Sequence, residues 1–154
     1  MNSHIGREAL VPNPALKGFT PLIGAWSTVG HHPMVPGVTF HGRATFDWHE
    51  GGAFVVMRSE IDEPEIPSGI AIFGSDDDAE TISMLYFDER AVSRHYEATM
   101  QPLQLRWWRT TPKFSQRYTL TIAPDGATMR GAGEMSRDGG PWTEDLGLTY
   151  TRTS

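Results

Sequence analysis

The chain has 154 residues, 38% of them hydrophobic and 21% charged, a composition that suits one folded domain with a packed core. Its formal net charge of −6 argues against a surface for nucleic acid or an anionic membrane, because both require a positive field. There is no cysteine, which excludes disulfides, thiolate metal sites and a cysteine nucleophile. No run approaches the roughly 20 apolar residues that a membrane helix needs, so we expect a cytoplasmic protein.

The N-terminal part of the chain predicts a short helix after a flexible segment. Residues 1–12 are polar and lack periodicity, so we expect them to be flexible and a single domain to span 13–154. Asn13 occupies an N-cap position, Pro14 the first helical position and Gly18 a stop position. This pattern predicts one or two helical turns.

The rest of the chain alternates apolar and polar residues with period two, and turn clusters recur about every 8 to 12 residues. That pattern is typical of an all-β sandwich or barrel, and the short loops favour an antiparallel meander. We predict strands at residues 23–30, 38–48, 53–61, 69–75, 80–87, 92–99, 103–109, 114–122, 128–135 and 142–152.

The alternation also predicts which side chains share a face of the sheet, because successive strand residues point to opposite faces. The predicted hairpins pair Trp48 with Ala53, Phe87 with Val92, Ala98 with Leu103, and Arg109 with Phe114. One face then stays apolar, with Phe40, Ala44, Phe46, Val55, Met57, Leu85, Phe87, Leu103, Leu105, Trp107, Tyr118, Leu120, Met129, Trp142, Leu146, Leu148 and Tyr150. The other face is predicted to meet solvent, with His41, Arg43, Asp47, Arg58, Glu60, His95, Glu97, Arg106, Arg117, Thr119 and Asp145.

An antiparallel sheet with one long apolar face must cover that face, and closure into a barrel also removes its exposed edges. We therefore predict an all-β fold in which an antiparallel meander of about ten strands closes into a barrel. Such a barrel is wider than its own side chains fill, since roughly eight strands are just filled or hold one small ligand. A cavity is expected, with Gly131 and Gly133 on the inner face leaving room.

Residues near the two ends of the predicted barrel resemble the calycin signature. They are Gly24-Ala25-Trp26 on the first strand and Arg152 in LTYTR on the last. In lipocalins and fatty-acid-binding proteins, the tryptophan closes the barrel base under an arginine from the final strands. The resemblance implies that Trp26 and Arg152 are a structural pair, held by a cation over an indole face.

Within the calycins, three stretches are similar to the nitrobindin-like haem-binding barrels and to related uncharacterised bacterial domains. They are LIGAWSTVGHHPMVPG, FHGRATFDWHEGGAFVVMRSE and DLGLTYTR. The closing strand of nitrobindins begins with the histidine that ligates haem iron, and the matching position here is Asp145. A carboxylate is not among the usual axial ligands, so we expect no haem and no other cofactor. The resembled family includes dimers, which implies a homodimer as one arrangement for this chain.

Polar and aromatic residues on the predicted inner face are the candidate ligand-binding residues. The predicted pairing places Arg94 opposite Trp107 and Trp107 opposite Gln116. A buried guanidinium is costly without an anion, so each arginine either waits for a ligand or pairs internally, with Glu144, Asp88 or Glu89 as partners. The candidates are Arg94, Tyr96, Trp107, Arg109, Gln116 and Tyr118.

The adjacent histidines His31 and His32 lie in the first connecting loop. Adjacent residues do not easily converge on one ion, and zinc sites draw three or four ligands from separated positions, so we predict no metal site. Imidazole titrates near neutrality, which makes either histidine a candidate for proton transfer, together with Tyr96 and Arg94.

Three functional hypotheses follow. The first is a barrel that binds a small, largely apolar ligand with an anionic or polar group. The second is an enzyme that uses the same cavity for acid-base chemistry on a bulky small-molecule substrate. The third is haem or nitric oxide chemistry, as in the resembled family.

Overall fold

The computed structural model describes residues 11–76 and 81–154, which form ten antiparallel strands and one 3-10 helix. Each strand pairs with its neighbour in the sequence, and β1 also pairs with β10, so the sheet closes into a barrel. The predicted all-β barrel with a short N-terminal helix is confirmed. The elements are η1 (Pro14–Leu22), β1 (Gly24–His31), β2 (Phe40–His49), β3 (Phe54–Ile61), β4 (Gly69–Ser75), β5 (Ile82–Asp88), β6 (Ser93–Gln101), β7 (Gln104–Arg109), β8 (Phe114–Ile122), β9 (Thr128–Arg137) and β10 (Thr143–Arg152).

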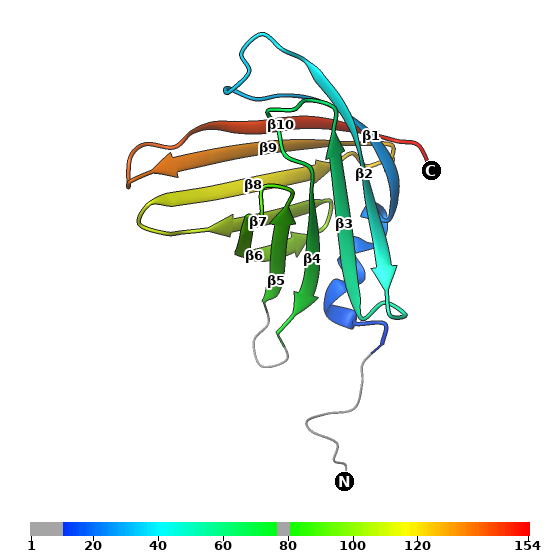
Figure 1. Cartoon of the computed structure of the whole chain (residues 1–154). Coiled ribbons are helices and arrows are strands. Elements are labelled where there is room, and N and C mark those ends of the chain that lie inside the picture. The colour runs from blue at the N-terminus through cyan, green and yellow to red at the C-terminus, as the bar shows by residue number, and fades with distance from the viewer. Residues whose placement is uncertain (1–10, 77–80) are drawn as a thin grey trace.

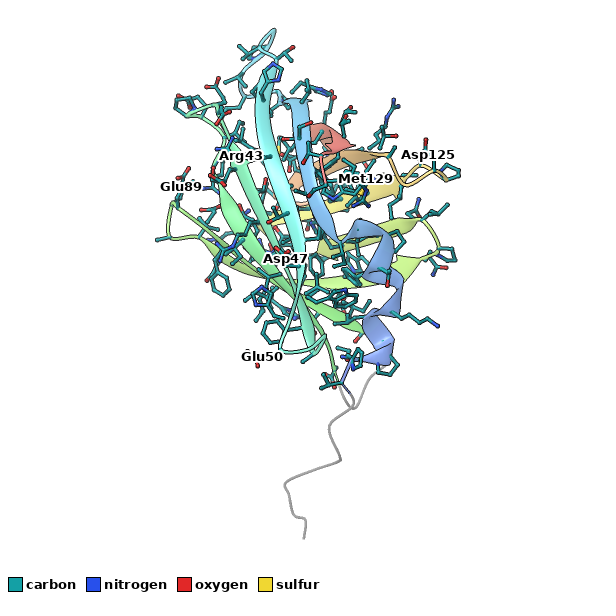
Figure 2. The ribbon with its side chains drawn as sticks, turned by 90° about the vertical axis from the view of Figure 1, so that its right-hand side faces the viewer. Arg43, Asp47, Glu50, Glu89, Asp125 and Met129 are labelled. Carbon is teal, nitrogen blue, oxygen red and sulfur yellow. The ribbon has the colours of Figure 1, made fainter. Side chains whose placement is uncertain are left out.

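Strands on opposite sides of the barrel cross each other at a steep angle. In Figure 1, β8, β9 and β10 run across the picture, whereas β2 to β5 run nearly from top to bottom. Arg43 and Asp47 lie on β2 and are exposed, as predicted for its outer face (Figure 2). Most of the flexible segment predicted at 1–12, and residue 80 of the fifth predicted strand, lie outside the described residues.

The helix η1 begins as the sequence predicts but does not stop at Gly18. The Asn13 side chain accepts a hydrogen bond from the Ala15 N–H at 3.0 Å, and the helix then continues to Leu22. A 3-10 helix has three residues per turn, so residues three apart share one face. That face carries Leu16, Phe19 and Leu22, each 0% exposed, and their burial explains why the helix continues past the glycine. Among the described residues, no helix is long and apolar enough to cross a membrane.

Trp26 and Arg152 lie together at the closed end of the barrel. The Arg152 Cζ atom is 4.2 Å from the centroid of the Trp26 ring, and the Trp26 indole N–H donates to the Leu22 carbonyl at 2.9 Å. Cation and indole therefore hold the end of η1 against the strands. Arg152 also donates hydrogen bonds to the carbonyl oxygens of Pro21, Ile23, Gly126 and Ser154.

Three predicted hairpins are shifted by an even number of residues. Trp48 pairs with Val55, Ala98 with Trp107, and Arg109 with Gln116. Trp107 therefore lies opposite Ala98 and Tyr118, and the prediction that it faces Arg94 and Gln116 is wrong. Because side chains alternate with period two, an even shift leaves every residue on its predicted face.

The β5–β6 hairpin is shifted by one residue, and the predicted faces of β5 are wrong. Phe87 pairs with Ser93 instead of Val92, because the turn holds an extra residue with Ala91 at a φ of 65°. Leu85 and Phe87 consequently point outward, 44% and 42% exposed. On the inner face their places are taken by Met84 and Tyr86.

Two other residues predicted inside lie outside. Leu103 occupies the β6–β7 turn with a φ of 61° and is 37% exposed. Trp142 precedes β10 and is 39% exposed, with the Arg117 guanidinium 3.9 Å from its ring centroid. Both residues lie between strands, where strand alternation no longer applies.

We expect Arg152→Ala to lower the free energy of unfolding by about 2 to 4 kcal/mol, because it removes several charge-assisted hydrogen bonds and the cation over Trp26. Urea denaturation followed by tryptophan fluorescence measures the change. Arg130→Ala, at an exposed position on β9, is the matched control. A loss below about 0.5 kcal/mol in Arg152→Ala would contradict the role of this arginine in closing the base.

Candidate functional site

The barrel encloses a cavity of about 490 Å³, within the range of small-molecule sites. Apolar side chains such as Met57, Met84 and Leu148 form much of its wall. Polar side chains gather on strands β6 to β10. All six residues predicted to contact a ligand line the cavity: Arg94, Tyr96, Trp107, Arg109, Gln116 and Tyr118.

Gln116 on β8 is the centre of the polar cluster. Its Oε1 accepts hydrogen bonds from Arg94 Nη1 at 3.1 Å and from the Tyr96 hydroxyl at 2.6 Å. Its Nε2 donates to Asp145 Oδ2 at 2.9 Å. Donors meet only the amide oxygen and an acceptor meets only the nitrogen, so the orientation of the amide is fixed.

His32 continues this cluster from the loop after β1. Its Nε2 lies 2.8 Å from Asp145 Oδ1, and its Nδ1 accepts the Met34 backbone N–H at 2.9 Å. Since Nδ1 accepts, the ring proton of the neutral imidazole is on Nε2 and is donated to Asp145. Both ring nitrogens are therefore engaged.

The neighbouring His31 does not line the cavity. Its side chain is 64% exposed, and its Nε2 lies 3.3 Å from Glu144 Oε1, on a carboxylate that is 69% exposed. The corresponding values for His32 and Asp145 are 12% and 14%. The two adjacent histidines thus have separate partners, as strand-like alternation requires.

Asp145 was predicted to face solvent, and that prediction is wrong. The β9–β10 ladder pairs Glu144 with Glu134 and then Gly147 with Ala132, so β10 holds one residue more than β9 between these pairs. An extra residue in one strand is a β-bulge, which re-aims side chains. Asp145 and Leu146 both line the cavity as a result.

The two inner arginines have no carboxylate partner among the described residues. The proposed partners are engaged elsewhere: Glu144 with His31, and Asp88 with Arg90. Glu89 accepts a hydrogen bond from the Ser68 N–H. The Arg94 side chain donates to Gln116, whereas the half-buried Arg109 side chain has neither hydrogen bond nor ion pair within the described part of the chain. The charged lining is positive in balance, with Arg90, Arg94, Arg109 and Arg137 against Glu65, Asp145 and the Asp88 carboxylate that pairs with Arg90.

Aromatic side chains form one wall of the cavity. Trp107 stacks on Tyr118 with ring centroids 4.6 Å apart and an interplanar angle of 11°. Tyr118 in turn lies over Gly131, where a Cβ would overlap its hydroxyl. Burial raises the pKa of Tyr96, although Arg94 and Arg109 oppose the effect, so its hydroxyl stays a donor at neutral pH.

A second polar cluster, unforeseen from the sequence, lies at the β5–β6 turn. The Asp88 side chain is 0% exposed and accepts from the Tyr86 hydroxyl at 2.7 Å and from Arg90 Nη2 at 2.6 Å. Burial alone would raise the pKa of Asp88, but the hydrogen bonds from Arg90 and Tyr86 outweigh it and lower the pKa to about 2. Burial, followed by the bond to Asp88, raises the pKa of Tyr86.

The residues at the candidate haem position do not fit an iron ligand. Both Asp145 oxygens are occupied, by His32 and Gln116, and the His32 Nε2 points at Asp145. Within residues 11–76 and 81–154, no three His, Asp or Glu side chains group closely enough to hold a metal ion.

Comparison with known proteins relates this chain to others by fold. No family model and no curated protein matches the sequence. The crystal structure of Rv2717c from M. tuberculosis is similar at a TM-score of 0.68 and 14% identity, covering 92% of this chain and 98% of that chain. The S-type phycobiliprotein lyase CPES from Guillardia theta is similar at a TM-score of 0.60 and 13% identity, covering 88% and 90%. At these identities the likeness shows a lipocalin-like barrel fold and nothing about activity.

We expect Asp88→Asn to destabilise the protein at pH 7 by about 1 to 3 kcal/mol, because it weakens charge-assisted hydrogen bonds to a covered carboxylate. The folded-state pKa of about 2 lies below the ordinary value of 3.8. The stabilisation by Asp88 is therefore complete above about pH 4 and is lost as the pH falls toward 2. Urea denaturation of both proteins between pH 7 and pH 2.5 measures this difference.

Asp47→Asn is the matched control, since Asp47 is exposed on β2 (Figure 2). Its effect should be small at every pH. If the difference in free energy of unfolding between wild type and Asp88→Asn stayed constant from pH 7 to pH 2.5, this would contradict the lowered pKa of Asp88.

Proposed function

We propose that the barrel binds a small, largely apolar molecule that carries an anionic or polar group. The observation that carries this proposal is the pair Arg94 and Arg109, half-buried on the cavity wall without a carboxylate partner among the described residues. Removing a guanidinium from water is costly unless an anion compensates for the lost hydration. A ligand carboxylate or comparable anion supplies that compensation.

The arrangement of donors suits an anion. Arg94 uses Nη1 to hold Gln116, which leaves its other N–H groups available, and Arg109 has all five of its N–H groups available. Fork-shaped guanidinium groups bind carboxylates in bidentate fashion more readily than a lysine does. The chain as a whole is acidic, at −6, so the positive balance of the cavity lining is a local feature.

The apolar part of the ligand would occupy the wall of Trp107, Tyr118 and Leu148. Burial of such a molecule is favourable by roughly 25 cal/mol per Å² of apolar surface, which is the main driving force for binding. The shared fold with a phycobiliprotein lyase supports a barrel that receives a small molecule, but it does not identify the ligand.

The geometry supports binding better than acid-base catalysis. A general base needs a free lone pair directed at the substrate, and both nitrogens of His32 are engaged. His31 lies outside the cavity lining, and the Tyr96 proton is donated to Gln116. His32, Tyr96 and Arg94 therefore act as a fixed polar wall in this arrangement.

Arg94→Ala should weaken the binding of an anionic ligand more than the binding of a neutral ligand of the same shape. With 1-pyrenebutanoate and 1-pyrenebutanol as probes, we expect the carboxylate to lose about 10-fold or more in affinity and the alcohol less than about 3-fold. Energy transfer from tryptophan to pyrene in an equilibrium titration measures both.

Arg58→Ala is the matched control, because Arg58 is exposed and lies on the outer face of β3. It should leave both affinities within about 2-fold of wild type. Equal losses for acid and alcohol in Arg94→Ala would count against an anion site, as would the absence of binding by either probe.

We further propose that neither Asp145 nor His32 ligates haem, because both Asp145 oxygens and both His32 ring nitrogens are engaged, and aspartate oxygen is not a usual axial ligand. Titration with haemin under oxidising and reducing conditions should give no saturable Soret band. A stoichiometric band that disappears in His32→Ala would overturn this proposal.

A further inference from the structure

Two tyrosine hydroxyls meet near the closed end of the cavity. The oxygens of Tyr118 and Tyr150 lie 3.5 Å apart, the limit of a hydrogen bond, and the residues are 8% and 1% exposed. Both line the cavity. Neither hydroxyl has another hydrogen-bond partner among the described residues.

The two hydroxyls carry more donor capacity than the pair can use. Each has one O–H, and a bond between them uses at most one of the two protons. Burial raises the pKa of Tyr150 to about 12 and that of Tyr118 well above its ordinary value, so both groups keep their protons at neutral pH. One O–H therefore faces the cavity without an acceptor, and a buried donor left without an acceptor is costly.

This pair lies deeper in the barrel than the polar cluster around Gln116. The Tyr150 ring meets the basal Trp26 edge-on, with centroids 6.5 Å apart and an interplanar angle of 89°. The Tyr118 ring extends over Gly131 toward Tyr150. Asp145, in the polar cluster, precedes Tyr150 on the same strand by five positions. At about 3.3 Å per residue, the backbone atoms at those two positions are roughly 15 Å apart along the strand.

The cavity thus has polar groups at two ends and an apolar stretch between them. Leu146 and Leu148 separate Asp145 from Tyr150 along β10, and both line the cavity. Arginines at one end require an anion, whereas a neutral O–H at the other end requires only an acceptor.

We infer that the barrel selects an elongated ligand with an anion at one end and a neutral hydrogen-bond acceptor, such as a ketone, at the other. This inference rests on the proposed function, since the arginines hold the anionic end. The Tyr118–Tyr150 pair donates to the acceptor and so distinguishes such molecules from plain hydrophobic acids. The alternative is that an ordered water accepts the hydrogen bond from the tyrosines. The affinity would then not depend on whether the far end of the ligand carries an acceptor.

Two acids of equal length separate these outcomes. 4′-Acetylbiphenyl-4-carboxylate has a ketone where 4′-ethylbiphenyl-4-carboxylate has a methylene. Apolar burial alone favours the ethyl compound, because water solvates the ketone better. We expect calorimetric titration of the wild-type protein to show the ketone binding about 3- to 10-fold more tightly, the effect of one net hydrogen bond.

The double variant Tyr118→Phe, Tyr150→Phe should lose this preference while its affinity for the ethyl compound stays within about 2-fold. The double change is needed because either hydroxyl can take over when the other is removed. Tyr86→Phe is the matched control: it also lines the cavity, but its hydroxyl donates to Asp88 at 2.7 Å, so the preference for the ketone should persist.

A second readout does not depend on the variants. The infrared carbonyl stretch of the bound ketone should move to lower frequency than in an aprotic solvent. Equal affinity of the two acids for the wild-type protein would overturn the inference and leave the anion site standing. Failure of both acids to bind would overturn the anion site and the inference together.

Discussion

The ladder between β1 and β10 joins the two ends of the meander. The barrel base and the candidate functional site both depend on it for their positions. It aligns Trp26 with Arg152 at one end and His31 with Gly147 at the other. The first pair closes the base over η1, and the second brings His32, the next residue, beside Asp145. With the ladder in place, every strand has two neighbours and no edge remains exposed. Ten strands also make the barrel wider than its core side chains fill, which is why a cavity of about 490 Å³ lies inside.

The fold could be predicted from the sequence because alternation tolerates some errors in pairing. The partners of Trp48, Ala98 and Arg109 differ from the predicted ones by two, four and two residues. Because all three shifts are even, the side chains stay on their predicted faces. The β5–β6 hairpin is shifted by one, which exchanged Leu85 and Phe87 for Met84 and Tyr86 on the inner face. Its cause, Ala91 in a left-handed conformation, has no sequence signal, because turns normally place glycine or asparagine there.

The candidate site was only partly predictable for a similar reason. Alternation alone placed Arg94, Tyr96 and Gln116 on one face, since all three lie in regular strands. Asp145 was missed because a bulge adds one residue to β10, and the neighbouring Gly147 was the one hint that the ladder is irregular there. The contact between His32 and Asp145 joins residues 113 positions apart, and no local pattern encodes it. The partners of Gln116 on β8 are likewise set by other strands, because β6 supplies both donors, Arg94 and Tyr96, and β10 supplies the acceptor Asp145.

The polar cluster has a mechanical consequence for the shape of the cavity. Hydrogen bonds run from β6 through Gln116 on β8 to Asp145 on β10 and on to His32 beyond β1, forming a partial hoop around the inner wall. Strands joined by such a hoop cannot move apart without breaking partly buried hydrogen bonds, so this half of the wall is stiff. The facing half, on β3 to β5, is lined by Met57, Ile61 and Met84. Methionine side chains are flexible and polarisable, so molecules of different width can be accommodated on that half while the polar half keeps its spacing.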